Sequence, residues 1–179
     1  KEATTSKPYK IVVFFPTARM VSFFAEFLND GLEFPAIELH SKKSQSSRNT
    51  SSSSFRQAKN AILFTSDLSA RGVDYPDVTH VIQVGLPESR EQYIHRLGRT
   101  ARAGKEGSGL LVLLPFESSF LSELKGLEVI PNDELLSGLS ELTETDCPEW
   151  MQQNYSKVRS GGNKLANSAQ LAYLSFLGY

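Results

Sequence analysis

Residues 9–28, YKIVVFFPTARMVSFFAEFL, carry two apolar patterns in direct succession. Residues 9–15 are apolar and β-branched almost throughout, which predicts a strand that is covered on both faces. Residues 18–28 predict a helix, because their apolar side chains recur at helical spacing: Met20, Val21, Phe24, Phe27 and Leu28. A buried strand that leads into an amphipathic helix is the repeating unit of an α/β fold.

The same alternation continues as far as residue 114. Further strands are expected from apolar runs at 36–40, 61–65, 79–85 and 109–114. A helix is expected at 45–55, although the serines at 51–54 are poor helix formers. Another is expected at 89–100, where Ser89 and Gln92 form a capping box. We therefore expect an α/β fold in which helices flank a parallel sheet on both faces, with ligands at the carboxyl ends of the strands.

After Phe116 the pattern becomes purely helical. Helices are expected at 117–127, 132–142, 148–158 and 163–177, with Asn163 as the N-cap of the last. We expect two parts, an α/β domain at 1–130 and an appended helical extension at 131–179. The polar lead-in that begins at Lys1 suggests a piece of a longer protein, and the extension is expected to be truncated at Tyr179.

Composition narrows the classes of function. The net charge is −1, so only local patches can support binding to nucleic acid. The single cysteine, Cys147, excludes an intramolecular disulfide and a cysteine-based zinc site, and it suits a reducing intracellular compartment. No apolar run reaches the length of a membrane span, so no membrane partner is expected. The chain also lacks a Gly-Lys-Ser/Thr phosphate loop and a carboxylate cluster suited to magnesium, and no metal ligands are expected in it.

The densest charge lies in residues 95–102, HRLGRTAR. Arginine stays charged at any working pH and grips phosphate oxygens with a planar fork of donors. If the helix continues through this stretch, then His95, Arg99 and Arg102 share one face, and Arg96 lies about 100° away from them. A solvated basic helix face is the alternative. The interleaved histidine and glycine favour a nucleotide phosphate as the partner.

Three weaker elements follow expected strands. Residues 65–74, TSDLSARGVD, offer hydroxyls and a carboxylate that can bind a ribose, and an ordinary strand–turn–helix junction is the alternative. Residues 40–48 place polar groups and Arg48 where a phosphate backbone could bind, and an exposed loop explains them equally well. Residues 14–17, FFPT, end in a threonine and mean little alone.

Taken together, these elements resemble the C-terminal RecA-like domain of DEAD-box RNA helicases, which belong to superfamily 2. Residues 93–102, YIHRLGRTAR, resemble motif VI of that family, and residues 66–74 resemble motif V. Residues 14–17 resemble motif IV, and residues 45–48, QSSR, resemble the Gln-x-x-Arg motif that follows it. The order and spacing agree across residues 8–115, and motif VI is the most specific of the four.

The resemblance implies a role for each matching position. Arg99 and Arg102 would be arginine fingers on the γ-phosphate of ATP. Asp74 would bind the ribose of ATP. His95, Arg96 and Arg71 would complete the nucleotide site and join the network of contacts between the two domains. RNA-backbone contacts would come from Thr17, Arg48 and Ser66. ATP with Mg²⁺ would be held mainly by an N-terminal RecA-like domain outside this chain, so the chain alone would be inactive.

A narrower resemblance concerns one branch of the family. Residues 73–78, VDYPDV, residues 82–85, IQVG, and the helical tail resemble a branch with a C-terminal extension, to which mitochondrial RNA-chaperone helicases belong. This favours mitochondria, while nuclear and cytoplasmic locations stay open. Two departures fall near Arg48: Ser41 replaces a usual glycine, and the serines at 51–54 replace a mixed helix.

Three other functions remain open at this point. The chain could be a non-catalytic RNA-binding or adaptor module that keeps the helicase fold. It could be half of a DNA helicase, since phosphate contacts do not distinguish the two nucleic acids. An unrelated nucleotide-binding α/β domain is the third, and the four ordered motifs leave little room for it.

Overall fold

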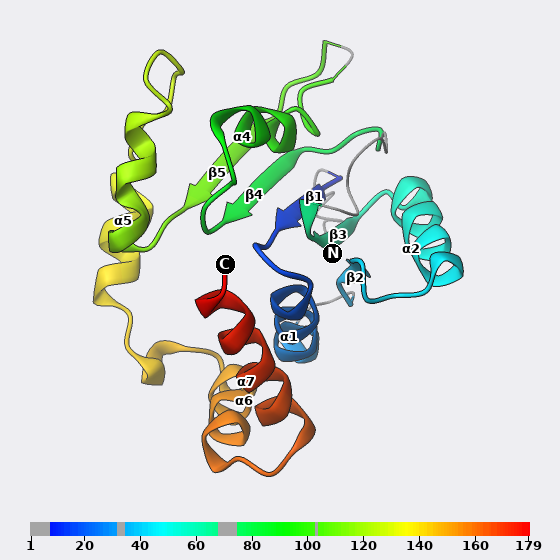
Figure 1. Ribbon diagram of the computed structural model, residues 1–179, viewed down its shortest axis with the longest axis vertical. Coiled ribbons are helices and arrows are strands. Elements are labelled where there is room, and N and C mark those ends of the chain that lie inside the picture. The colour runs from blue at the N-terminus through cyan, green and yellow to red at the C-terminus, as the bar shows by residue number, and fades with distance from the viewer. Residues whose placement is uncertain (1–7, 32–34, 68–74, 103) are drawn as a thin grey trace, which may run out of the picture.

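A computed structural model describes residues 8–31, 35–67, 75–102 and 104–179 of the chain. Within these residues, five parallel strands form one sheet in the order β2-β3-β1-β4-β5 (Figure 1). Their bounds are β1 Lys10–Phe14, β2 Ile37–Leu39, β3 Ala61–Thr65, β4 His80–Val84 and β5 Ser108–Val112. Each strand lies within, or one residue outside, the range that the apolar pattern predicts. The α/β fold with a parallel sheet is confirmed.

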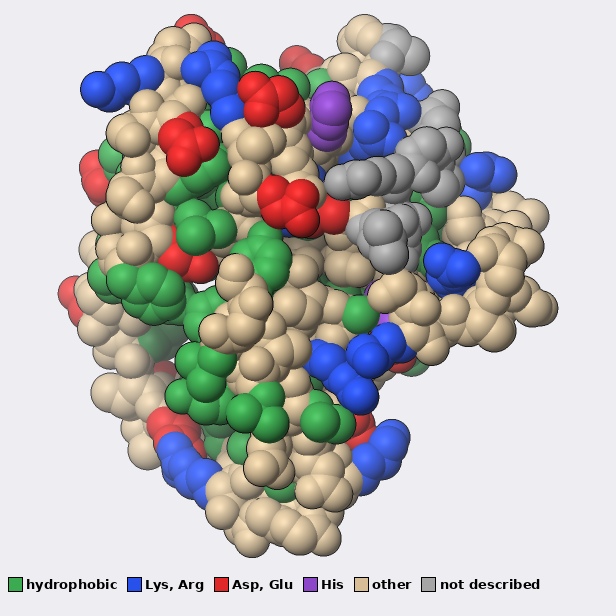
Figure 2. Space-filling view, viewed as in Figure 1, with side chains coloured by type: hydrophobic (Ala, Val, Ile, Leu, Met, Phe, Trp, Pro, Cys, Tyr) green, Lys and Arg blue, Asp and Glu red, His purple; other side chains and the backbone are tan. Residues whose placement is uncertain are grey.

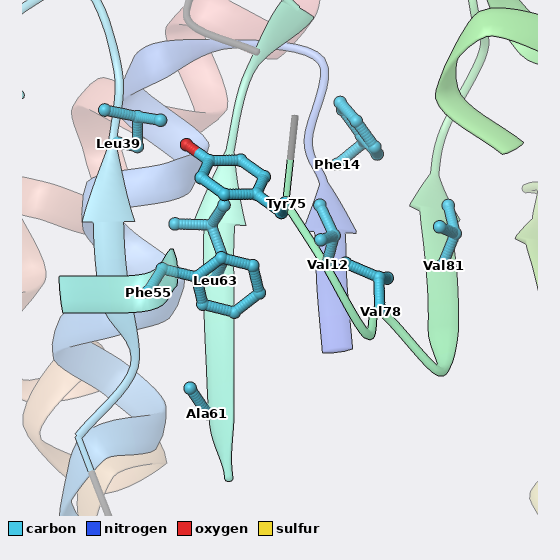
Figure 3. Close-up of a cluster of buried hydrophobic side chains, with 9 residues drawn as sticks. All are labelled: Val12, Phe14, Leu39, Phe55, Ala61, Leu63, Tyr75, Val78 and Val81. Atoms are coloured by element: carbon cyan, nitrogen blue, oxygen red, sulfur yellow. The ribbon is translucent and has the colours of Figure 1, made fainter. Parts of the chain in front are cut away.

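Two helices cover one face of the sheet, namely α2 (Gln45–Gln57) and α4 (Arg90–Leu97). Figure 3 shows the core beneath α2, in which the rings of Phe55 and Tyr75 lie over Leu63 of β3. The two rings meet edge to face, with their centroids 4.9 Å apart. Phe55 is fully buried, and this packing holds α2 together although its serines are poor helix formers.

The opposite face is covered by α1, Ala18–Leu28, whose bounds are those predicted. Its residues Val21 and Ala25 are fully buried against Val13, Phe15 and Phe64 of the sheet region. The helix begins at Thr17, whose hydroxyl accepts a hydrogen bond from the Met20 amide at 3.2 Å. A short 3-10 turn, η1 (Asn29–Gly31), follows it.

The stretch after β5 differs from the prediction in two elements. The α-helix expected at 117–127 is a 3-10 helix, η2, at Pro115–Ser122. Within η2 the hydroxyl of Ser118 donates to the Pro115 carbonyl and that of Ser122 to the Ser119 carbonyl. Serines of α5 (Asp133–Glu141) make the same local bond, so these bonds do not account for the 3-10 winding. The three remaining α-helices follow the expected order: α5, then α6 Glu149–Ser160 and α7 Lys164–Leu177. A short 3-10 turn that was not expected, η3 (Glu144–Asp146), lies between α5 and α6.

The last two helices add a layer outside α1, as Figure 1 shows. Tyr155 of α6 packs on Phe27 with ring centroids 5.0 Å apart, and Asn154 donates to the Phe27 carbonyl at 2.8 Å. Lys164 at the start of α7 pairs with Glu26 at 2.9 Å. The C-terminal segment thus returns to the helix that follows β1. Among the described residues, no helix combines the length and hydropathy that a membrane crossing requires.

Candidate nucleotide and RNA site

Polar residues gather where the parallel strands end. Thr17 follows β1, His40 follows β2, and Ser66 with Asp67 follows β3. Thr65 ties two of these ends together, because its buried hydroxyl donates to the Leu39 carbonyl at 2.8 Å. Since the carboxyl ends of parallel strands share an edge, this is where an α/β sheet binds ligands.

Arg96 lies inside this edge, with only 2% of its surface exposed. Its Nε donates to Asp67 Oδ1 at 2.6 Å, and Nη2 donates to the other carboxylate oxygen. Its guanidinium carbon lies 5.5 Å from the centre of the Phe14 ring, in a cation–π contact. The arginine therefore links α4 to the ends of β1 and β3. Two of its three guanidinium nitrogens are thus paired within the domain, and its expected part in the nucleotide and inter-domain network stays a prediction.

Arg99 and Arg102 follow the end of α4. The predicted shared helix face is wrong, because the helix stops at Leu97 and Gly98 caps it. Each arginine instead folds back on the last turn: Arg99 Nε donates to the His95 carbonyl at 3.2 Å, and Arg102 Nε donates to the Gly98 carbonyl at 2.7 Å. Both side chains are half-buried, while His95 is exposed.

Thr100 fixes the turn that carries the two arginines. It is buried, and its hydroxyl donates to the Val78 carbonyl at 2.6 Å. Gly107 allows this close packing, because a Cβ there would lie 2.1 Å from Thr100 Oγ1. Ala101 has a φ of 53°, a left-handed conformation that costs an alanine about 1–2 kcal/mol. Strain of this kind is often held at functional sites by the surrounding structure.

Arg48 lies in the first turn of α2, half-buried. Its Nη2 donates to Gln45 Oε1 at 2.6 Å, so the two named residues of the Gln-x-x-Arg motif contact each other. Gln45 in turn donates to Asn49 at 2.8 Å. Ser44 caps the helix by accepting from the Ser47 amide. The guanidinium is therefore held at the helix end that follows β2, on the same edge of the sheet as Thr17.

Of the remaining predicted residues, one is buried and two lie outside the residues that the structure describes. Ser66 is buried, with 6% of its surface exposed. Arg71 and Asp74 lie outside the described residues, as does most of the stretch that resembles motif V. In the part of the chain that the structure describes, no group of three or more His, Cys, Asp or Glu side chains could hold a metal ion.

Helix α7 reaches the same edge, which sequence reasoning missed. Ser175 Oγ lies 2.7 Å from Thr17 Oγ1 and donates to the Ala172 carbonyl at 2.8 Å. A hydroxyl has one proton, so Ser175 accepts the proton of Thr17. Beyond the helix, Tyr179 Oη donates to the Leu86 carbonyl at 2.5 Å. The apolar pattern of residues 163–177 predicts a helix, but it does not predict which polar groups that helix contacts.

Tyr179 also lies close to the buried arginine. Burial raises the pKa of its hydroxyl, and the Arg96 guanidinium acts in the opposite direction. The hydroxyl therefore keeps its proton at neutral pH and remains a donor. The chain end, α4 and the end of β3 thus meet at one place.

Comparison with known proteins agrees with this geometry. Residues 1–104 match the family model described as helicase conserved C-terminal domain. DEAD-box ATP-dependent RNA helicase 25 of Oryza sativa subsp. japonica is 43% identical over 180 residues, which cover 100% of this chain and 28% of that protein. DEAD-box ATP-dependent RNA helicase 31 of Arabidopsis thaliana is 45% identical over 172 residues, 96% of this chain and 22% of that protein. The chain thus spans less than a third of these relatives.

Solved structures show the same fold. Mss116p DEAD-box helicase domain 2 bound to an RNA duplex matches with a TM-score of 0.62 and 32% identity, over 78% of this chain and 60% of that one. Mss116p bound to single-stranded RNA and AMP-PNP matches with the same TM-score and 33% identity, over 86% of this chain and 32% of that one. The chain belongs to the helicase conserved C-terminal domain family, as a RecA-like domain of the DEAD-box type.

Proposed function

We propose that this chain is the C-terminal half of an ATP-dependent RNA helicase and completes an ATP site that a second RecA-like domain begins. One observation carries the proposal. Thr100 fixes a strained turn that carries both Arg99 and Arg102 beyond the end of α4, while the sequence has no phosphate loop of its own. Two forked cations fit phosphate oxygens, but they do not cradle a nucleotide or activate water.

In this proposal one set of residues contacts ATP and another set contacts RNA. Arg99 and Arg102 stabilise charge on the γ-phosphate during hydrolysis, with His95 exposed beside them and Asp74 on the ribose. Mg²⁺ and the rest of ATP belong to the N-terminal domain. Arg48 and Thr17, at the ends of β2 and β1, contact the RNA backbone without reading bases, which suits an enzyme that acts on many sequences. Closure of the two domains on ATP and RNA assembles the site and separates a short duplex, and hydrolysis reopens it.

The appended helices belong to the same proposal. We place the boundary between the α/β domain and its extension at residue 131. The last described strand ends at Val112, and every described element after it is helical, which supports a division in this region. The proposal also includes a mitochondrial location, because the helical tail resembles that of the branch to which mitochondrial RNA-chaperone helicases belong.

The test is ATP hydrolysis by the full-length protein with saturating RNA. Arg99→Ala and Arg102→Ala should each lower the RNA-stimulated rate by about 10³- to 10⁵-fold, as arginine fingers do in related phosphoryl transfers. Arg99→Lys should fail to rescue, because an ammonium lacks the planar fork. Binding of single-stranded RNA should be largely unchanged. Arg159→Ala is the matched control, since Arg159 is an arginine of α6 paired with Glu144.

Each rival function gives a different result. Hydrolysis that survives both alanine substitutions contradicts the finger assignment. A full-length protein that binds RNA without hydrolysing ATP is an adaptor, and stimulation by DNA rather than RNA identifies a DNA helicase. The 179-residue chain alone should hydrolyse no ATP at helicase-like rates, and an active isolated chain rules the proposal out.

A further inference from the structure

Helix α5 presents an apolar face that nothing in the described structure covers. None of its residues is buried, and Leu136, Leu139 and Leu142 are 64%, 55% and 56% exposed. Together with Leu135 they form the α5 leucine face: Leu135 and Leu139 are spaced i, i+4, Leu136 and Leu139 are spaced i, i+3, and Leu142 is the residue that caps the helix. In Figure 1 the helix stands at the edge of the molecule, and Figure 2 shows hydrophobic side chains gathered on that side.

This exposure calls for a partner. The helix has nine residues, and isolated helices shorter than about 12–15 residues are marginal in water. Helices of this length normally gain their stability from packing of an apolar face. A second surface that buries these leucines would supply what the described domain does not.

Charge indicates the kind of partner. Residues 128–149 contain seven acidic residues and no lysine, arginine or histidine, although the whole chain is nearly neutral. Glu134 and Glu141 of α5 are seven residues apart, so they lie along one edge of the helix beside the leucines. An acidic segment repels nucleic-acid phosphates and anionic lipid, and it attracts a cationic protein surface.

A glycine at the centre of the helix adds a second, independent observation. A groove on α5 is lined by Asn132, Glu134, Leu135, Gly138, Leu139 and Leu142. A Cβ at Gly138 would meet no atom within 4 Å, so no neighbour in the described structure requires a glycine there. Glycine in a helix interior costs about 1 kcal/mol relative to alanine. The open space beside Gly138, called here the Gly138 notch, leaves room for a long side chain whose stem would lie on the leucines and whose charged head would reach Glu134.

We propose that α5 is a docking site for a basic amphipathic helix of a partner protein. The apolar stripe of that helix covers the α5 leucine face, and its lysines or arginines lie along the edge of Glu134 and Glu141, with one of them in the Gly138 notch. A second copy of this chain fits poorly, because a two-fold contact would set the same acidic edge against itself. The proposal goes beyond ATP hydrolysis and does not depend on it.

The test is a selection with a defined probe. A displayed library of 20-residue helices with basic, neutral and acidic rims is selected on the full-length protein and on its Leu136→Ser/Leu139→Ser variant. Basic sequences with apolar residues at i, i+3 or i+4 and i+7 should be enriched at least tenfold on the wild type and not on the variant. Leu174→Ser on α7 is the matched control, since Leu174 is 56% exposed and lies outside the α5 leucine face, and it should select as the wild type does.

The affinity of one selected peptide for further variants of the protein then distinguishes the contribution of charge from that of shape. Glu134→Gln/Glu141→Gln should weaken binding about three- to tenfold at physiological salt and flatten its salt dependence. Gly138→Leu should weaken it by a similar factor, because the leucine fills the notch while keeping the helix. Equal enrichment on wild type and variant, enrichment of neutral or acidic rims, or a dimer in sedimentation that Leu136→Ser dissolves would each overturn the proposal.

Discussion

Helices α5 and α7 come from the same helical tail, and both have leucine-rich faces, yet only α7 packs on the α/β domain. Leu165 and Ala172 of α7 are buried, whereas α5 buries none of its residues. Polar contacts add to this apolar burial. The ends of α7 meet Glu26 and Thr17 of the α1 region through an ion pair and a hydrogen bond. The comparison teaches that an appended helix joins a domain where its polar groups find partners as well as where its apolar face finds a surface.

The largest expected effect compares one leucine from each helix. Leu165→Ala should lower the free energy of unfolding by about 2–5 kcal/mol, because it leaves a cavity between α7 and the rest of the domain. Leu139→Ala on exposed α5 should change it by no more than about 0.5 kcal/mol. Urea unfolding with an unchanged m-value is the measurement. Equal losses at the two sites would show that α5 is packed in solution.

A second comparison uses two glycines. A Cβ at Gly31 would lie 1.9 Å from a ring atom of Trp150, so Gly31→Ala should destabilise the chain by about 1–3 kcal/mol through overpacking against α6. Gly138→Ala on α5 should instead stabilise it by about 0.5–1 kcal/mol. Thermal unfolding of the two variants measures the sign of each change in stability. Trp150 is the only tryptophan in the sequence, so its emission should change in the first variant alone, and an unchanged spectrum there would contradict the packing of α6.

The smallest effect concerns the contact between α7 and the proposed RNA edge. Ser175→Ala should lower stability by about 0.5–1.5 kcal/mol, the net worth of one hydrogen bond. It also releases the Thr17 proton, so affinity for single-stranded RNA should hold or rise. Ser160→Ala is the control, because Ser160 makes the same local bond to a carbonyl, that of Lys157, three residues earlier. RNA affinity that falls in Ser175→Ala alone would mean that the serine itself helps to hold RNA.

Much of the fold follows from the sequence, because buried parallel strands and amphipathic helices have distinct periods. The bounds of α1 are predicted to the residue. The pattern fails on where a helix ends and how tightly it winds: it extends α4 past Gly98, and it predicts an α-helix where the structure has a 3-10 helix at Pro115–Ser122. Periodicity assigns a residue to a face of its own element, and it carries no information on contacts across the chain.

The candidate site shows the same limit. Motif spacing singles out Arg48 shortly after an expected strand, and the structure has it in the first turn of α2, which follows β2. It also singles out Arg99 and Arg102, which lie in the turn between α4 and β5. It does not reveal that Arg96 is buried against Asp67, 29 positions earlier, or that Ser175 meets Thr17 from 158 positions away. Contacts over such separations depend on how the elements stack in three dimensions.

The buried guanidinium of Arg96 has a mechanical consequence. It binds the carboxylate of Asp67, two residues after β3, lies over a ring of β1, and belongs to the helix that leads into the arginine turn. The segment proposed to touch RNA and the segment that leads to the residues proposed to touch ATP therefore both contact one buried charged group. A displacement of either segment acts on the same guanidinium, which gives the two proposed ligands a shared point of contact in the fold.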